Sequence, residues 1–169
     1  SYSSLLSDSI YCNDRIPYND ANGQATGYGT TDFATFYAPY IRTYTNHLPI
    51  LNCLTKEDSF TVSDTTNGNG SLINPIGLIT ADEVEMAGGI NQNNTNYYLY
   101  TNSEYYTMSP SHSSWYAGSL GIFVSVIDAN GNLIFNRVGQ SLGVRPVISL
   151  KSTVLASGSG TYNDPYVVQ

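Results

Sequence analysis

GLITADEVEMAGG, residues Gly77–Gly89, carries the clearest local structural signal in the chain. Thr80 is a favourable N-cap residue and Glu83 stands three positions later, which together predict a capping box at the start of a helix. Ala81–Ala87 then supplies about two helical turns, and Gly88 suits the left-handed position that ends a helix. A helix this short does not persist alone in water, so it must pack against another part of the chain.

The packing partner is expected in the second half of the chain, where strand patterns dominate. GIFVSVI (121–127) and LIFNRV (133–138) are rich in β-branched and aromatic residues, and the turn signal DANGN separates them, which predicts a β-hairpin. GVRPVISL (143–150) predicts a further strand, in which Pro146 marks an edge or a bulge. TYNDPYVV, near the end, predicts a short closing strand.

The first half carries weaker signals. Phe60–Val62 predicts a short strand, and the turn-rich Tyr18–Thr31 predicts a long surface loop. A second helix, interrupted or kinked by Pro39, is predicted from apolar residues spaced i, i+3, i+4, i+7 and i+8. These are Phe33, Phe36, Tyr37, Tyr40 and Ile41. The whole predicts one α+β domain over residues 1–169, with two short helices against a twisted, mostly antiparallel sheet and with long loops.

Composition restricts the functional classes. Of 169 residues 41% are hydrophobic but only 11% are charged, so the polar surface must consist mainly of Ser, Thr, Asn, Gln and Gly. Such a surface favours an extracellular or cell-surface location, a phage particle included. The net charge of −7, without a basic stripe, argues against nucleic-acid binding. No apolar run is long enough to span a membrane, and a signal peptide or N-terminal anchor, if the gene encodes one, is expected to have been removed.

The two cysteines are Cys12 and Cys53. A disulfide between them would close a loop of about 40 residues and stabilise the fold by roughly 4 kcal/mol. Two free thiols are the alternative, and the other signs of an oxidising compartment favour the disulfide. A zinc site is not expected, because His47 and His112 stand in no ligand spacing with the cysteines.

Several stretches together resemble a known family. GLITADEVEMAGG resembles the helix segment of C-type-lectin-fold modules of the formylglycine-generating-enzyme type, YYTMSPS (105–111) their aromatic-rich segment, and GVRPV (143–147) their closing strand. Variable proteins of diversity-generating retroelements and related bacterial surface or pilin-like proteins share this fold. The resemblance covers roughly residues 70–169 and implies a C-type-lectin-like fold.

The resemblance also implies roles for particular residues. Arg145 matches the closing-strand Arg, which is usually structural and pairs with backbone or a buried carboxylate. The family's reactive cysteines would lie near the C-terminus, whereas this chain has none after Cys53, so that chemistry is not expected. The ligand face of the variable proteins corresponds here to Ser111–Leu120 and Phe135–Ser141.

Composition points to the same region. NYYLYTNSEYYTMSPSHSSWYAG (96–118) is rich in Tyr, Ser, Asn and Gly, the residues that dominate antibody paratopes. Strand propensity alone would also explain tyrosines here. Tyr97, Leu99 and Tyr105 could pack inward by strand alternation. His112, Trp115 and Tyr116 lie in a stretch without periodicity and are expected in an exposed loop. The predicted ligand-binding residues are Ser111, His112, Ser113, Ser114, Trp115, Tyr116, Ser119, Phe135, Asn136, Arg137 and Gln140.

Catalytic and metal sites are weakly indicated. Capping and the helix dipole explain Asp82 and Glu83, and no pair of carboxylates announces a glycosidase. Ser109 and His112 are too close in sequence for triad geometry. DANGN (128–132) has the oxygen spacing of a calcium loop but lacks its further acidic residues, which favours a plain turn.

The sequence therefore predicts a secreted or surface-displayed module, without catalysis or cofactor, that binds a protein or glycan through aromatic, nearly uncharged loops. Diversification of those loops by a retroelement would be visible only in the DNA. The alternatives are the structural head of a pilin-like or fibre protein, assembling through the same patch, or an enzyme that uses a metal or an unrecognised carboxylate pair.

Overall fold

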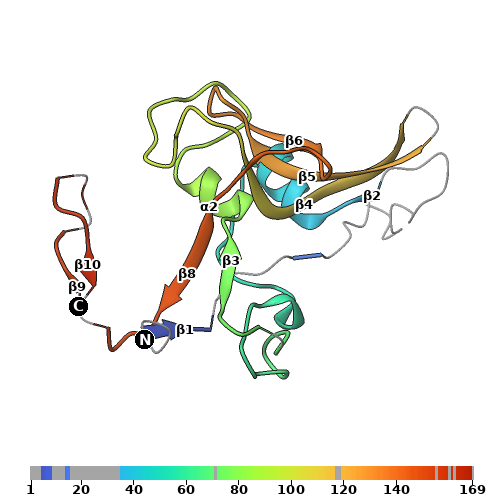
Figure 1. Cartoon of the computed structure of the whole chain (residues 1–169). Helices are drawn as coiled ribbons and strands as arrows, with labels where there is room; N and C mark the ends of the chain where they lie inside the picture. The colour runs from blue at the N-terminus through green and yellow to red at the C-terminus, as the bar shows by residue number, and fades with distance from the viewer. Residues whose placement is uncertain are drawn as a thin grey trace.

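A computed structural model describes residues 5–8, 14–15, 35–70, 72–116, 119–154, 156–159, 161 and 163–168. Within them the chain has an α+β architecture, with two short α-helices and a mostly antiparallel sheet (Figure 1). The coarse fold class predicted from sequence is thus confirmed. The predicted loop Tyr18–Thr31 and Cys12 lie outside the described residues, while Cys53 is disulfide-bonded.

The main sheet is an antiparallel meander of β4 (Tyr105–Tyr116), β5 (Ser119–Ile127) and β6 (Leu133–Arg137). Two short strands flank the outer edge of β4, namely β2 (Thr35–Phe36), antiparallel to it, and β7 (Gly143–Val144), parallel to it. The predicted hairpin of β5 and β6 is confirmed. Figure 1 shows that β4 and β5 extend together well beyond the rest of the sheet.

The turn between β5 and β6 is stabilised by its own aspartate. Asp128 Oδ1 accepts hydrogen bonds from the backbone N–H of Asn130 at 2.8 Å and of Asn132 at 2.9 Å. Gly131 has a φ of +80°, a backbone conformation that residues other than glycine rarely adopt. DANGN therefore forms a plain turn whose carboxylate is already used by backbone donors.

A second, three-stranded sheet has the order β1 (Leu6–Ser7), β8 (Pro146–Leu150), β3 (Ile76–Leu78). The strand predicted over 143–150 is thus divided at Arg145, with β7 in the main sheet and β8 in this one. β8 is the central strand of this sheet, but Pro146 pairs only with Leu78 of β3, because β1 reaches only Ser149 and Leu150, so the expected edge position holds locally. Pro146 is tolerated as its first residue, where the missing N–H costs little.

The predicted closing strand exists only in a reduced form. β10 (Val167–Val168) pairs with β9 (Ala156–Ser157) in a separate two-stranded ribbon. Figure 1 shows this ribbon apart from both other sheets, so it closes neither of them.

Helix α2 (Ala81–Met86) forms as its capping signals predict. Thr80 Oγ1 accepts from the Glu83 N–H at 3.1 Å, and Glu83 Oε2 accepts from the Thr80 N–H at 2.8 Å, so the capping box is complete. Gly88 follows the helix with a φ of +108°, the predicted left-handed ending.

The first half departs from prediction at two places. The predicted helix starts later: Phe36 belongs to β2, helix α1 (Ala38–Tyr40) follows, and the chain continues into the π-helix η2 (Ile41–Thr45). Pro39 does not interrupt this helix but lies in its first turn, where proline is favoured. Phe33 lies outside the described residues.

The strand predicted at Phe60–Val62 is absent, and a 3₁₀ turn, η3 (Lys56–Asp58), precedes that segment. The reason is local: the Thr61 N–H donates to Asn69 Oδ1 at 3.3 Å, and Thr61 Oγ1 accepts from the Gly70 N–H at 2.8 Å. Side chains of the loop itself therefore take the place of a neighbouring strand.

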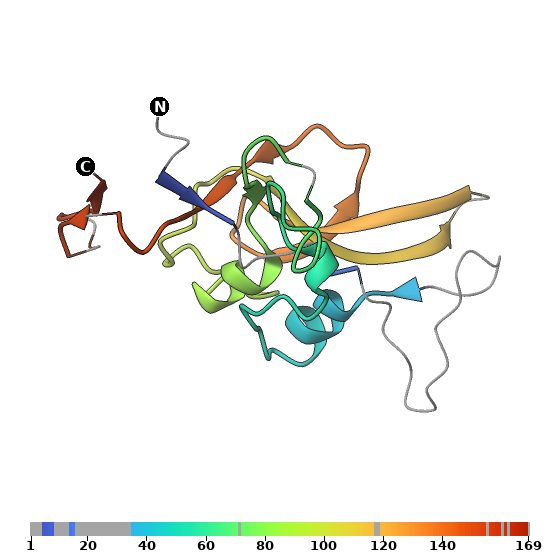
Figure 2. The same ribbon diagram turned by 90° about the horizontal axis from the view of Figure 1, so that it is seen from below.

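Both helices cover the same face of the main sheet (Figure 2). The core lies between α2 and that face and consists of Ile79, Ala81, Val84, Tyr97, Tyr105, Ile127 and Leu133. Tyr97 and Tyr105 are buried and Leu99 packs against them, as expected. The Arg145 guanidinium stacks 4.6 Å from the centre of the Tyr105 ring and donates to the Leu99 carbonyl at 2.6 Å, so Arg145 fixes the crossing between the two sheets.

Candidate functional site

Beside this core, six rings form a continuous group between η2 and the main sheet, which we call the aromatic cluster. Each ring comes from a different element, so residues far apart in sequence meet here. The members are Phe36 (β2), Tyr40 (α1), Tyr44 (η2), His112 (β4), Phe123 (β5) and Phe135 (β6).

His112 lies at the centre of the aromatic cluster. Its ring stacks on Phe123, with ring centres 4.4 Å apart and planes 8° apart, and meets Phe135 edge-on at 4.7 Å. Tyr40 and Tyr44 approach Phe135 edge-on at 6.0 and 5.9 Å. These are the favourable geometries for aromatic pairs.

The prediction that His112 is exposed in a loop is wrong, because it lies within β4 and is only 8% exposed. Burial lowers the pKa of its imidazole, which favours the neutral form at pH 7. Its Nδ1 lies 2.9 Å from Ser111 Oγ, so the ring has a polar partner without carrying charge. His112 therefore acts here as an aromatic packing residue.

Phe135 is the member of the cluster that reaches solvent most clearly, with 37% of its surface exposed. Beside it, the Arg137 guanidinium lies 5.8 Å from the centre of the Phe123 ring. A partner that approached this edge of the cluster would meet one exposed ring, the half-buried rings behind it and a single cation.

The opposite face of β5 carries a second apolar surface, which we call the outer apolar strip. It consists of Leu120, Ile122 and Val138, which are 47%, 54% and 56% exposed. Leu120 and Ile122 are two positions apart on β5 and so share one face of the strand. Val138 continues from β6, and its N–H donates to the Ile122 carbonyl at 3.2 Å.

The predicted ligand-binding residues do gather on one sheet, but strand alternation divides them between its two faces. His112 pairs with Phe123, and Phe123 pairs with Arg137, which places these residues on the face toward the helices. Ser113 pairs with Ile122 on the other face, which also carries Asn136 opposite Val124. One continuous ligand face made of all the predicted residues is therefore excluded by the register.

Burial narrows the predicted set further. Ser111 is completely buried, and its carbonyl accepts from the Tyr37 N–H at 3.0 Å, so its side chain presents no surface to a ligand. Ser113 and Ser114 are half-buried, whereas Ser119 is exposed, as is Gln140 in the turn after β6.

Trp115 and Tyr116 belong to β4, not to the loop that the sequence suggested. The register places them opposite Leu120 and Ser119, at the far end of the extended β4–β5 hairpin. Their side chains lie outside the described part of the structure.

Sequence reasoning missed four members of the aromatic cluster: Phe36, Tyr40, Tyr44 and Phe123. A signal existed for three of them, because Phe36, Tyr40 and Tyr44 recur every four residues. The spacing predicts Phe36 and Tyr40 on one face of a helix, but nothing in the sequence shows that this face meets β4, β5 and β6.

An ionic network anchors η2, which carries Tyr44, to helix α2. Arg42 Nε and Nη2 donate to the two oxygens of Asp82 at 2.7 and 2.8 Å, and Arg42 Nη1 donates to Asp14 at 2.9 Å. Asp82 also accepts from the Ile50 N–H at 2.8 Å. Asp82 thus serves a packing role between elements, in addition to its place in the first turn of the helix.

Two further polar residues, Ser109 and Glu85, form hydrogen bonds within the protein. Ser109 is buried, and its Oγ accepts from the Ala81 N–H at 2.9 Å. Glu85 contacts His47 Nδ1 at 2.7 Å. In the described part of the chain, no group of three or more His, Cys, Asp or Glu residues is arranged to hold a metal ion, and no helix is long and apolar enough to cross a bilayer.

Comparison with protein-family models, curated proteins and solved structures finds no match to this chain.

Proposed function

We propose that the chain is a non-catalytic ligand-binding module that recognises a protein or glycan at the solvent edge of the aromatic cluster, centred on Phe135. The observation that carries the proposal is an exposed ring that packs against the buried His112 and against half-buried rings, and that is flanked by one cation. Rigid aromatic groups supply large contact areas at low entropic cost and dominate binding hot spots. They also suit the apolar faces of sugar rings.

The proposal includes a C-type-lectin-like fold and a secreted or surface-displayed location, as in the variable proteins of diversity-generating retroelements. The capped helix α2, the β5–β6 hairpin and the divided strand at Arg145 support the fold. The low charge content supports the location.

If a retroelement diversifies the gene, burial restricts where changes can accumulate. Ser111 and His112 are enclosed and belong to the packing, whereas Ser119 and Gln140 are exposed. Sequencing the gene in sister isolates tests this part of the proposal. Such a retroelement mutates adenines in the DNA. Amino-acid changes in codons with mutated adenines, confined to the accessible residues of 113–141, support this part of the proposal. An identical sequence over 113–141 in all isolates refutes it.

Binding is tested by screening a glycan array and a displayed peptide library, and then measuring the affinity of the strongest ligand for variants. Phe135→Ala should weaken binding by about 30-fold, as loss of a hot-spot ring does. The double variant Trp115→Ala/Tyr116→Ala tests the far end of the hairpin. Ile73→Ala is the control, because Ile73 is 93% exposed and lies outside the site.

The melting temperature of each variant separates lost binding from lost folding. Unchanged affinity in Phe135→Ala, with the fold intact, refutes the site. Loss of affinity only in the double variant moves the site to the tip of the hairpin.

A structural head domain of a pilin-like or fibre protein is the second candidate, and the outer apolar strip favours it. Ile122 and Val138 are exposed on the main sheet, and β6 is the last strand of that sheet among the described residues. Exposed apolar surface beside an open edge suits contacts between copies. Concentration-dependent association in sedimentation experiments, abolished by Ile122→Ser, would favour this candidate over a monomeric binding module.

A further inference from the structure

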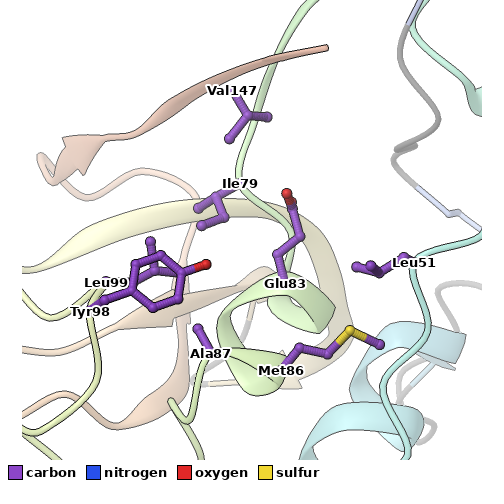
Figure 3. Close-up of a pocket in the computed structure, with 8 residues that line it drawn as sticks. All are labelled: Leu51, Ile79, Glu83, Met86, Ala87, Tyr98, Leu99 and Val147. Carbon is purple, nitrogen blue, oxygen red and sulfur yellow. The ribbon is translucent and has the colours of Figure 1, made fainter. Parts of the chain in front are cut away.

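Away from the main sheet's aromatic cluster, helix α2 borders an apolar pocket of about 310 Å³ (Figure 3). Its lining comes from α2, the segment after it, β8 and the loop around residue 51. The lining residues are Leu51, Ile79, Glu83, Met86, Ala87, Tyr98, Leu99 and Val147. A volume of this size, at the lower end of the usual range for ligand sites, suits a small organic molecule.

Among the described residues of this lining, Glu83 is the only one with a carboxylate. Both of its hydrogen bonds, from the Thr80 N–H at 2.8 Å and from Thr80 Oγ1 at 2.9 Å, go to Oε2. Oε1 therefore keeps its acceptor capacity. Figure 3 shows the Glu83 side chain between Leu51 on one side and Tyr98 on the other.

Among the described residues, none forms a salt bridge with Glu83. Burial raises the pKa of Glu83, and the one charge that acts on it appreciably is Asp82, which raises the pKa further. Arg42, the cation on the neighbouring element, is engaged by Asp82 and Asp14. An ionised carboxylate in apolar surroundings gains most from a cationic partner that brings its own apolar groups.

The rim of the pocket suits such a partner. Tyr98 is 84% exposed at the opening, and Met86 is half exposed. An aromatic face beside a carboxylate attracts ammonium groups through the ring quadrupole, and a methionine side chain adapts to an alkyl or aryl stem. The net charge of −7 adds a favourable long-range field for a cation.

We propose that this pocket binds a small amphipathic organic cation, whose ammonium group contacts Glu83 Oε1 and the Tyr98 ring while its apolar stem packs against Ile79, Leu99 and Val147. The site and its ligand class are independent of the proposed function of the sheet.

The test uses phenethylammonium as the probe and the neutral phenethyl alcohol of similar shape as its control, with binding followed by amide chemical shifts in NMR titrations. The wild type should bind phenethylammonium saturably, with shifts centred on residues of the lining, and at least about tenfold more tightly than the alcohol. Glu83→Gln should remove that preference, because glutamine retains the capping box but not the charge. Affinity for the alcohol should stay the same.

Glu57→Gln is the matched control, because it removes one carboxylate charge from an exposed residue of η3 that does not line the pocket. It should leave the affinity for phenethylammonium unchanged. Tyr98→Leu should weaken binding of the cation several-fold and of the alcohol less. The proposal is overturned if no saturable shifts appear in the pocket, if amine and alcohol bind equally, or if Glu57→Gln reduces affinity as much as Glu83→Gln.

Discussion

The salt bridge between Arg42 and Asp82 allows the sharpest test of how the fold is held together. The side chains of Arg42, Asp82 and Asp14 are 13%, 5% and 6% exposed, so all three charges are largely removed from water. We predict that Asp82→Asn destabilises the protein strongly. Asparagine keeps the shape and an acceptor for the Ile50 N–H, but it turns a doubly hydrogen-bonded ion pair into a weak contact.

The expected cost follows from the geometry. Breaking one side of a buried ion pair usually costs about 3–5 kcal/mol, and Asp14 still balances part of the Arg42 charge, so we expect about 3 kcal/mol. For a domain of this size, each kcal/mol lowers the melting temperature by roughly 2–4 °C, which gives a decrease of roughly 6–12 °C. Raising the salt concentration should change this cost little, because buried pairs are weakly screened.

Urea unfolding of four proteins, the wild type, Asp82→Asn, Arg42→Met and the double variant, measures the interaction directly. The double variant should cost at least about 1 kcal/mol less than the sum of the single variants, because the second substitution removes a partner that is already lost. Glu57→Gln, which removes an exposed charge, should stay within about 0.5 kcal/mol of the wild type. Additive single variants, or an Asp82→Asn as stable as Glu57→Gln, would refute the role assigned to the network.

Two further predictions concern single residues. Because burial lowers the pKa of His112, the unfolded state binds the proton more readily, and the free energy of unfolding should fall as the pH decreases below about 6.5. A His112→Phe variant should lose this pH-dependent component. Urea titrations at several pH values test this, and equal pH slopes for both proteins would contradict it. Gly131→Ala should destabilise the protein by more than about 1 kcal/mol, because φ is +80° and a Cβ there would lie 1.9 Å from the Asn94 carbonyl oxygen. Gly139→Ala should be nearly neutral, because a Cβ there meets nothing within 4 Å. Similar melting temperatures for the two variants would contradict this prediction.

The features that the sequence predicted well are those fixed by neighbours within a few residues. The capping box depends on Thr80 and Glu83, and the β5–β6 turn on Asp128 and Gly131, so each signal is complete in a short window. These elements formed close to their predicted limits. Pro39 fits its helix because the helix starts only at Ala38, directly after Phe36 pairs with β4. That pairing partner is distant in sequence, so the local pattern cannot predict where the helix starts.

Strand β4 shows what short windows cannot supply. YYTMSPSHSSWY has a proline and five serines or threonines and lacks β-branched apolar residues, so its middle resembled a loop. It becomes a strand because β5 and β2 pair with its two sides. The register shifts on either side of Pro110 accommodate the residue that lacks an N–H, as bulges do.

The hydroxyl groups of β4 bind other groups of the protein, although the Ser-rich composition of this segment suggests contacts with a ligand. Thr107 Oγ1 donates to the Ser125 carbonyl at 2.7 Å, Ser109 accepts from the helix α2 backbone, and Ser111 contacts His112. Hydroxyl groups that looked like adaptable contacts for a ligand instead satisfy buried backbone and imidazole groups. The aromatic members that remain accessible were therefore the more informative part of the pattern.

The exposed ring of the proposed binding site depends on buried and half-buried residues behind it. Phe135 lies against His112, Tyr40 and Tyr44, and Tyr44 belongs to the helix that Arg42 ties to α2. Any displacement of η2 would move Tyr44, and with it the directly preceding Tyr40 of α1, and would loosen the exposed ring. A binding surface preorganised in this way loses little entropy when its ligand binds. It also separates residues that must stay constant, inside the cluster and the network, from those at its edge, where substitutions can change the ligand without changing the fold.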